Sequence, residues 1–84
     1  MKILVQKFGG SSVADLECMK KVRTKVLDAV KQGYKVVVVL SARSGQTNKL
    51  VEMAYQWSDE PNPAEYDALL ATGEQESVAL FSML

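Results

Sequence analysis

The chain has 84 residues, 48% of them hydrophobic, and its ten basic side chains equal its ten acidic ones in number. A formal charge of zero argues against the basic surface of a nucleic-acid-binding protein, and one cysteine without histidine excludes an internal disulfide and a Cys/His zinc site. The first apolar run ends at Gln6, which is too short for a signal peptide or a membrane span, so we expect a cytoplasmic protein with no membrane partner.

Residues 3–8 predict a short buried strand, because most of them are large and apolar. A Gly-Gly pair interrupts the strand, and a helix should follow, with Ser12 as its cap and Asp15 in capping-box spacing. Apolar side chains recur every three or four residues over 13–30, which is the spacing of one helical face. Gly33 is expected to end this helix in the left-handed conformation.

Residues 35–40 contain four consecutive valines and predict a second strand. The run is apolar without alternation, which is typical of a parallel strand that is covered on both faces. The two strands and the helix between them therefore predict a βαβ unit with a right-handed crossover. Residues 41–46 should form a loop, and Thr47 should cap a second helix.

Turn-forming residues occupy 58–63, and a short helix is expected over 64–71. Thr72 and Gln75 stand in capping-box spacing, so we expect a separate last helix to begin there. No glycine or proline closes that helix before Leu84, which suggests that a larger protein continues beyond this residue.

The fold class that follows is α/β, with a mainly parallel central sheet between layers of helices. Two strands are too few for an independent sheet, so residues 1–84 are expected to be the N-terminal portion of a larger α/β/α sandwich.

Three segments are expected to meet at one edge of the sheet, two of them at the carboxyl ends of strands, where ligands bind in open α/β sheets. The first is 7–12, in which Lys7 stands beside two glycines. Glycines let backbone N–H groups approach a phosphate, and a lysine stabilises its charge. A tight turn with no ligand is the alternative. The P-loop and dinucleotide-binding patterns are both missing.

The second segment is 41–47, in which Ser41, Ser44 and Thr47 offer hydroxyl groups to a small polar substrate. The alternative is a plain approach to a helix that Thr47 caps. Arg43 can pair with a carboxylate or a phosphate, although a solvated loop arginine is the favoured interpretation.

The third segment contains Glu74, for which the sequence leaves two roles open. It is either an acid stabilised by the first turn of a helix or the partner of a substrate ammonium group. Glu76 is interpreted as a solvated helix residue and Cys18 as a helix residue without special chemistry. No residue is predicted to bind a metal.

Taken together, three blocks resemble the aspartate kinase branch of the amino acid kinase family. The first is Lys-Phe-Gly-Gly-Ser-Ser-Val over 7–13, and the second is Val-Val-Val-Leu-Ser-Ala over 37–42, followed by Gly45, Thr47 and Asn48. The third is Leu-Ala-Thr-Gly-Glu-Gln-Glu-Ser over 70–77. The resemblance covers nearly the whole chain, in order.

The resemblance implies that the parent enzyme phosphorylates the side-chain carboxylate of L-aspartate with ATP, as the first step toward lysine, threonine and methionine. Lys7 would be the catalytic residue. Phosphate contacts would come from Lys7, Phe8, Gly9, Gly10, Ser11 and Ser41. Aspartate contacts would come from Ser41, Thr47, Asn48 and Glu74. The family also implies Mg²⁺ bound by segments outside this chain, and a homo-oligomeric parent.

Two positions depart from the family pattern: Ser11 replaces a threonine and keeps the hydroxyl group, and Arg43 stands where many members have methionine. Two other functions stay open. One is another amino acid kinase, such as an acetylglutamate or glutamate kinase, against which the third block argues. The other is a non-catalytic structural fragment, and the isolated segment is expected to be inactive.

Overall fold

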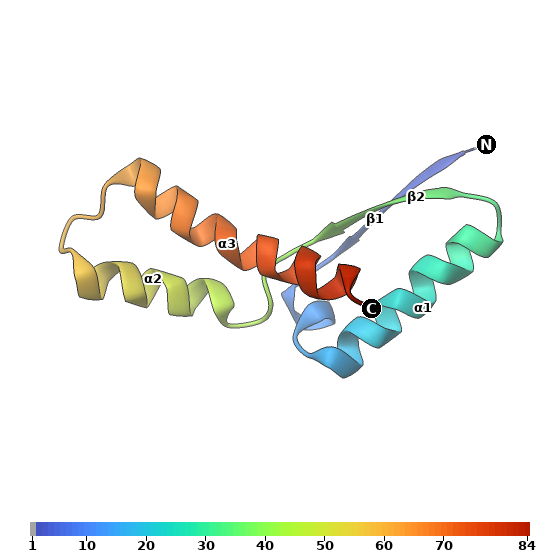
Figure 1. Cartoon of the computed structure of the whole chain (residues 1–84), viewed down its shortest axis with the longest axis horizontal. Helices are drawn as coiled ribbons and strands as arrows, with labels where there is room; N and C mark the ends of the chain where they lie inside the picture. Colours follow the sequence, from blue (N-terminus) through green and yellow to red (C-terminus); the bar gives the residue numbers. More distant parts are fainter. Residues whose placement is uncertain (1) are drawn as a thin grey trace.

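The computed structural model describes residues 2–84 and confirms an α/β fold. Its elements follow one another along the chain as β1 (Ile3–Phe8), a one-turn 3-10 helix η1 (Gly10–Val13), α1 (Leu16–Lys31), β2 (Lys35–Leu40), α2 (Gln46–Trp57) and α3 (Pro63–Ser82). Figure 1 shows two parts side by side. A βαβ unit forms one end of the molecule, and the hairpin of α2 and α3 forms the other.

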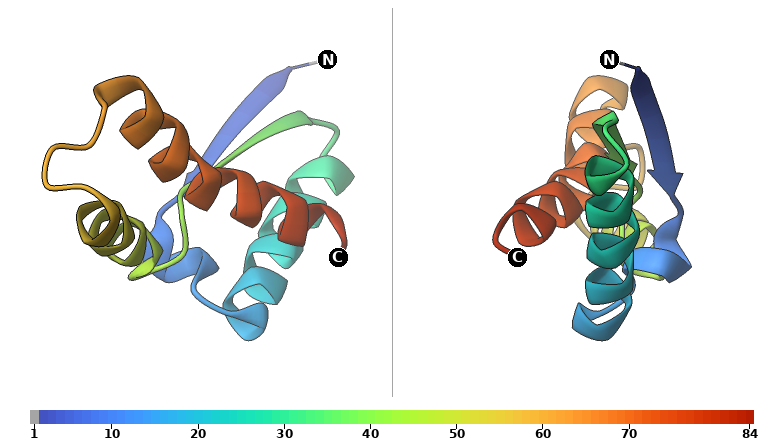
Figure 2. Two further views of the ribbon diagram at one scale, coloured as in Figure 1. Left: turned by 60° about the vertical axis from the view of Figure 1, so that its left-hand side comes forward. Right: turned by 90° about the vertical axis from the view of Figure 1, so that its right-hand side faces the viewer.

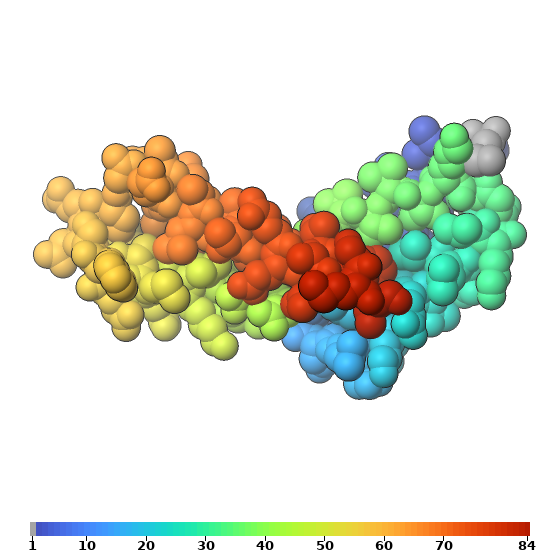
Figure 3. Space-filling model, viewed as in Figure 1, coloured from blue at the N-terminus to red at the C-terminus, as the bar shows by residue number. Residues whose placement is uncertain are grey.

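The two strands are parallel neighbours, in register from Ile3 opposite Lys35 to Phe8 opposite Leu40. Helix α1 connects them and covers one face of the pair, where a buried cluster forms from Val13, Met19, Val22 and Leu40. Phe81 of α3 packs against the same cluster, so the end of the hairpin helix returns to the βαβ unit. Figures 2 and 3 show this return, with the last turns of α3 (red) lying beside α1 (cyan).

The other face of the strand pair is open within residues 2–84. The valine run of β2 predicted a strand covered on both faces in a larger sandwich, and residues 2–84 supply the cover of one face. Ile3 and Val5 are 68% and 62% exposed, and Val37 and Val39 of β2 are 49% and 42% exposed. The alternation of exposed and half-buried side chains along both strands follows from this one-sided cover.

Helix α1 ends as predicted but begins later than predicted. Gly33 adopts a φ of 96°, the left-handed conformation expected at the end of a helix. At the other end, the capping residue is Asp15 and not Ser12. The Asp15 carboxylate accepts a hydrogen bond from the Cys18 amide at 2.8 Å. Residues before Asp15 form η1 instead of the first turn of α1.

The second helix also begins differently, because Gly45 is its capping residue, with a φ of 82°. Thr47 lies inside the first turn of α2 and does not cap it. Gly45 turns the chain sharply into the helix, and α2 has no side-chain hydrogen bond at its cap.

Helix α3 is continuous from Pro63 to Ser82, so the predicted boundary at Thr72 is wrong. Asn62 caps this helix by accepting hydrogen bonds from the amides of Ala64 and Glu65. The Thr72 hydroxyl donates to the Leu69 carbonyl oxygen at 2.6 Å, which is a helix-interior bond and not a cap. No helix in the described part of the chain has the length and apolar character needed to cross a membrane.

Candidate functional site

The loops that follow β1 and β2 lie together at the carboxyl edge of the strand pair, as predicted. The Ser41 amide donates a hydrogen bond to the Phe8 carbonyl oxygen at 3.1 Å. The Ser44 amide donates to the Gly10 carbonyl oxygen, also at 3.1 Å. These two backbone bonds fix the first loop against the second, so residues that are more than thirty positions apart in the sequence share one site.

The two glycines of the first loop differ in their surroundings. A side chain at Gly10 would place its Cβ only 2.8 Å from the Ala42 carbonyl oxygen, so the second loop occupies that space. A Cβ at Gly9 would meet nothing within 4 Å. The close approach permitted by Gly10 therefore serves contact between the two loops, and only Gly9 leaves room beside the backbone for a ligand.

Lys7 is exposed, and alternation along β1 places its side chain on the open face of the strand pair with Ile3 and Val5. Within residues 2–84 it forms no ion pair or side-chain hydrogen bond. Phe8 points the other way and packs against the core cluster, so only its backbone faces the loop. The ammonium group of Lys7, the residue before the last one of β1, thus has no partner within residues 2–84.

The hydroxyl groups singled out by the sequence are distributed around these loops. Ser41 is half-buried directly after β2, whereas Ser11 in η1 is exposed. Thr47 and Asn48 are exposed in the first turn of α2. The structure therefore brings Ser41 next to the first loop through the Phe8 bond and leaves the side chains of Thr47 and Asn48 open to solvent.

Glu74 lies in the middle of α3, where it is exposed, and not in a first helical turn. The stabilisation by a helix N-terminus that the sequence offered as one role is therefore excluded. Helix α3 contacts the second loop through Gly73, the buried residue that precedes Glu74. A Cβ there would lie 3.0 Å from the Ala42 Cβ and 3.4 Å from Leu50 Cδ1.

Arg43 and Glu76, both interpreted from the sequence as solvated, form an ion pair instead. Arg43 Nη2 donates to Glu76 Oε1 at 2.7 Å, and Gln46 Nε2 donates to Glu76 Oε2 at 3.4 Å. Both side chains of the ion pair are partly buried, at 36% and 41% exposure. A pair 33 positions apart has no local sequence signature; the one clue is that Glu76 follows Gly73 by three residues and so shares its helix face.

Asp15 and Cys18 influence each other at the start of α1. The hydrogen bond from the Cys18 amide lowers the pKa of Asp15 below its usual value of 3.8. A separate hydrogen bond between the Cys18 side chain and the Asp15 carboxylate raises the pKa of the Cys18 thiol above its usual 9.0. Cys18 therefore stays protonated at neutral pH, which agrees with a thiol that has no special chemistry.

Charge is distributed unevenly along the chain. Residues 1–49 contain all ten basic side chains and three acidic ones, whereas residues 50–84 contain seven acidic side chains and no basic one. The loop with Lys7 thus lies in a basic half, which favours phosphate, and Glu74 lies in an acidic half, which favours an ammonium group. Residues 2–84 contain no cluster of three or more His, Cys, Asp or Glu side chains that could hold a metal ion.

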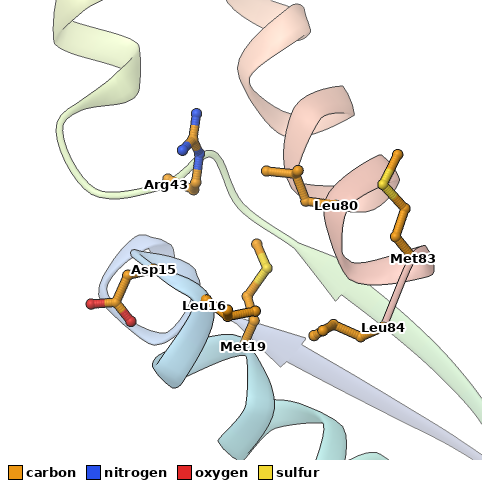
Figure 4. A pocket seen from close by; sticks show the side chains of 7 residues that line it. All are labelled: Asp15, Leu16, Met19, Arg43, Leu80, Met83 and Leu84. Carbon is orange, nitrogen blue, oxygen red and sulfur yellow. The ribbon is translucent and has the colours of Figure 1, made fainter.

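A cavity of about 270 Å³ opens between the start of α1 and the end of α3. Its lining is mostly apolar, with Leu16, Met19, Leu80, Met83 and Leu84, and the side chains of Asp15 and Arg43 also border it (Figure 4). None of the residues expected to bind ATP or aspartate lines it. The candidate site is therefore the loop edge and not this cavity.

Comparisons with known proteins identify the family of this sequence and fold. The profile of the amino acid kinase family matches residues 2–84. An aspartate kinase of Pseudomonas putida is 47% identical and an aspartokinase of Geobacillus stearothermophilus 48% identical, each over 83 residues that make up 99% of this chain and 20% of the relative. The crystal structure of aspartate kinase from Synechocystis superposes with a TM-score of 0.93 at 44% identity, covering 96% of this chain and 14% of that one. On these grounds the chain belongs to the amino acid kinase family.

Proposed function

We propose that these residues form the N-terminal portion of the catalytic domain of an aspartate kinase. The enzyme would transfer the γ-phosphoryl group of ATP to the side-chain carboxylate of L-aspartate. A carboxylate oxygen attacks the γ-phosphorus, the bond from that phosphorus to the bridging oxygen breaks, and ADP leaves as 4-phospho-L-aspartate forms. Two backbone bonds support this most directly. They run from the amides of Ser41 and Ser44 to the first loop and hold that loop beside the second.

On the phosphate side, Lys7 is the proposed catalytic residue, because its ammonium group has no ionic partner within residues 2–84 and can meet charge that develops on the transferred phosphoryl. Gly9 leaves its backbone open to the phosphates. Phe8 and Gly10 would contribute through the backbone, and the remaining phosphate contacts are Ser11 and Ser41.

On the aspartate side, Ser41 would stand between the two substrates, because it follows β2 directly and is bonded to the first loop. Thr47 and Asn48 expose polar groups in the next turn of chain. Glu74 would bind the substrate ammonium, since its carboxylate has no ionic partner within the described residues.

Mg²⁺ accompanies ATP in phosphoryl transfer, but the described residues do not offer it a ligand cluster, and Glu76 is already paired with Arg43. We therefore assign the metal to other segments of the kinase. The place in lysine, threonine and methionine biosynthesis, a cytoplasmic location, the lack of a nucleic-acid partner and a homo-oligomeric parent stay predictions.

The proposal is tested by a chimera in which residues 2–84 replace the corresponding segment of the Geobacillus stearothermophilus aspartokinase, to which they are 48% identical. We expect ADP formation that depends on aspartate and not on glutamate or acetylglutamate. Lys7→Met should lower kcat by roughly 10²-fold or more with a smaller change in the aspartate KM, because the lysine contact strengthens in the transition state.

Lys35→Met is the matched control, because Lys35 is also an exposed strand lysine but lies at the opposite end of the strand pair. A folded chimera that prefers glutamate, or one in which Lys7→Met behaves like the control, would contradict the proposed function.

A further inference from the structure

Arg43 and Glu76 connect two elements that the proposed aspartate site needs. Arg43 belongs to the loop between β2 and α2, two residues after Ser41, and Glu76 belongs to α3, two residues after Glu74. Their ion pair, at 2.7 Å, is the shorter of the two ion pairs found in the described residues. It therefore joins the segment with Ser41 to the segment with Glu74.

The loop is held on both of its sides. Toward the phosphate site, the Ser44 amide is bonded to the Gly10 carbonyl oxygen, and within the loop the Gln46 amide donates to the Arg43 carbonyl oxygen at 2.9 Å. Toward α3, Arg43 and Gln46 each bond one carboxylate oxygen of Glu76. If α3 changed its orientation, the two bonds to the Glu76 carboxylate would break, whereas the bond between Ser44 and Gly10 would remain.

Packing brings α3 close to the loop, and the ion pair adds a contact that depends on the rotation of the helix. Buried Gly73 allows the helix backbone to approach Ala42, and Ser77 on the same side is fully buried. Glu76 points to the loop from this packed side. At about 100° per residue, Glu74 and Glu76 lie on opposite flanks of the helix side that carries Gly73, so a rotation of α3 that displaces Glu76 also displaces Glu74.

An alternative is that Arg43 itself binds a substrate carboxylate or phosphate. Its Nη2 atom is already engaged at 2.7 Å and both oxygens of its partner accept hydrogen bonds, whereas its buried Nε has no partner within residues 2–84. A charge-assisted contact of this kind in a partly buried place favours a structural partner over a free ligand group.

From these contacts we infer that Arg43 and Glu76 are positioning residues for the aspartate site. Their ion pair sets the rotation of α3 and so the place of Glu74 relative to Ser41. The inference rests on the proposed function. Neither side chain needs to touch a substrate, and the loop with Lys7 and Gly9 keeps its own backbone bonds when the pair is lost.

The test uses the active chimera and separates the two substrates. Arg43→Met and Glu76→Gln should each raise the aspartate KM about tenfold, because small displacements of a binding group are costly. The ATP KM should change by less than about twofold. The double variant should be no worse than either single variant, since both remove one interaction. The exchange of charges, Arg43→Glu with Glu76→Arg, should recover most of the aspartate affinity.

Arg23→Met and Glu65→Gln are matched controls, because they remove the other arginine and another α3 glutamate without touching the pair. A purely structural role would lower the melting temperature without separating the KM of aspartate from that of ATP. If the unmodified chimera does not use aspartate, the proposed function fails and this inference falls with it. If the chimera is active but Arg43→Met and Glu76→Gln match their controls, or if their effects add, only this inference is overturned.

Discussion

At the scale of single residues, two adjacent glycines serve different purposes. Gly10 lies against the Ala42 carbonyl oxygen, so it is required by the contact between two loops of the same chain. Gly9 faces open space with a φ of −77° and a ψ of 175°, a conformation that any residue can adopt. Packing and backbone conformation within residues 2–84 do not require a glycine here, and in the proposed function Gly9 leaves room for the phosphate chain of ATP.

Gly10→Ala should destabilise the chimera by about 1–3 kcal/mol, because a methyl group at 2.8 Å from a backbone oxygen forces the two loops apart. Gly9→Ala should leave the free energy of unfolding within about 0.5 kcal/mol of the parent. It should raise the ATP KM, because the methyl group occupies the proposed phosphate approach. Thermal unfolding and steady-state kinetics measure both effects, and equal stability losses at the two positions would contradict the distinction.

Glu74→Gln separates substrate binding from stability. The change keeps the shape and removes the charge, so the aspartate affinity should fall by about 2–5 kcal/mol, as for one side of a desolvated ion pair. The ATP KM should stay the same. Since Glu74 is exposed in the middle of α3, the unfolding free energy should change by less than about 0.5 kcal/mol. An unchanged aspartate KM would refute the substrate role, and Glu65→Gln shows the effect of a neutralised glutamate elsewhere on α3.

At the scale of secondary structure elements, helix ends depend on the geometry that the neighbouring chain imposes. Ser12 and Thr47 are good capping residues by type, yet Asp15 and Gly45 take those places. Residues 10–13 contact the second loop through the bond from the Ser44 amide to the Gly10 carbonyl oxygen. They form η1 there, and α1 begins only at Leu16. Likewise, Thr72 and Gly73 do not interrupt α3. The Thr72 hydroxyl bonds within the helix, and the missing side chain of Gly73 lets the helix pack against Ala42.

The Asp15 cap predicts a pH dependence. The pKa of Asp15 is lower in the folded chain than its usual 3.8, so its carboxylate stabilises the folded state above that value, and the contribution is lost as the pH falls through the lowered pKa. Asp15→Asn keeps a side-chain oxygen for the Cys18 amide but does not titrate. Between about pH 6 and about pH 3, the parent should therefore lose melting temperature relative to Asp15→Asn. If the melting temperatures of the two proteins fall by the same amount over that range, the charge of Asp15 does not contribute to the stability of the cap.

At the scale of the whole molecule, residues 2–84 are elongated, with extents of 50 × 26 × 18 Å. The open face of the strand pair exposes Ile3, Val5, Val37 and Val39, and the chain spans 20% of the curated relatives it matches. These residues contain the proposed phosphate loop and aspartate contacts but no cluster of side chains for Mg²⁺.

The isolated 84-residue chain should therefore not form aspartyl phosphate. The expected result is ADP release that does not depend on aspartate and does not exceed that of the Lys7→Met chain, because positioning and charge neutralisation by the metal are both incomplete. The assay measures ADP formation with and without aspartate, as for the chimera. Aspartate-dependent turnover by the parent chain, absent from Lys7→Met, would show that the segment is catalytically sufficient.

Much of this protein was predictable from local pattern alone. Both strands have the bounds that their apolar runs predicted, and Gly33 closes α1 in the left-handed conformation. The meeting of the loops after β1 and β2 followed from parallel pairing, since carboxyl ends share one edge. Residue types and short-range periodicity determine such features because they depend on neighbours within a few positions.

Tertiary structure decided what depends on distant segments. The continuity of α3, the difference between Gly9 and Gly10, and the ion pair of Arg43 with Glu76 all arise where α3 and the first loop meet the loop after β2. Each contact joins residues about thirty positions apart, so no local spacing encodes it. The physical reason is that close packing and partial burial make a charged or small side chain advantageous only after the backbone elements have come together.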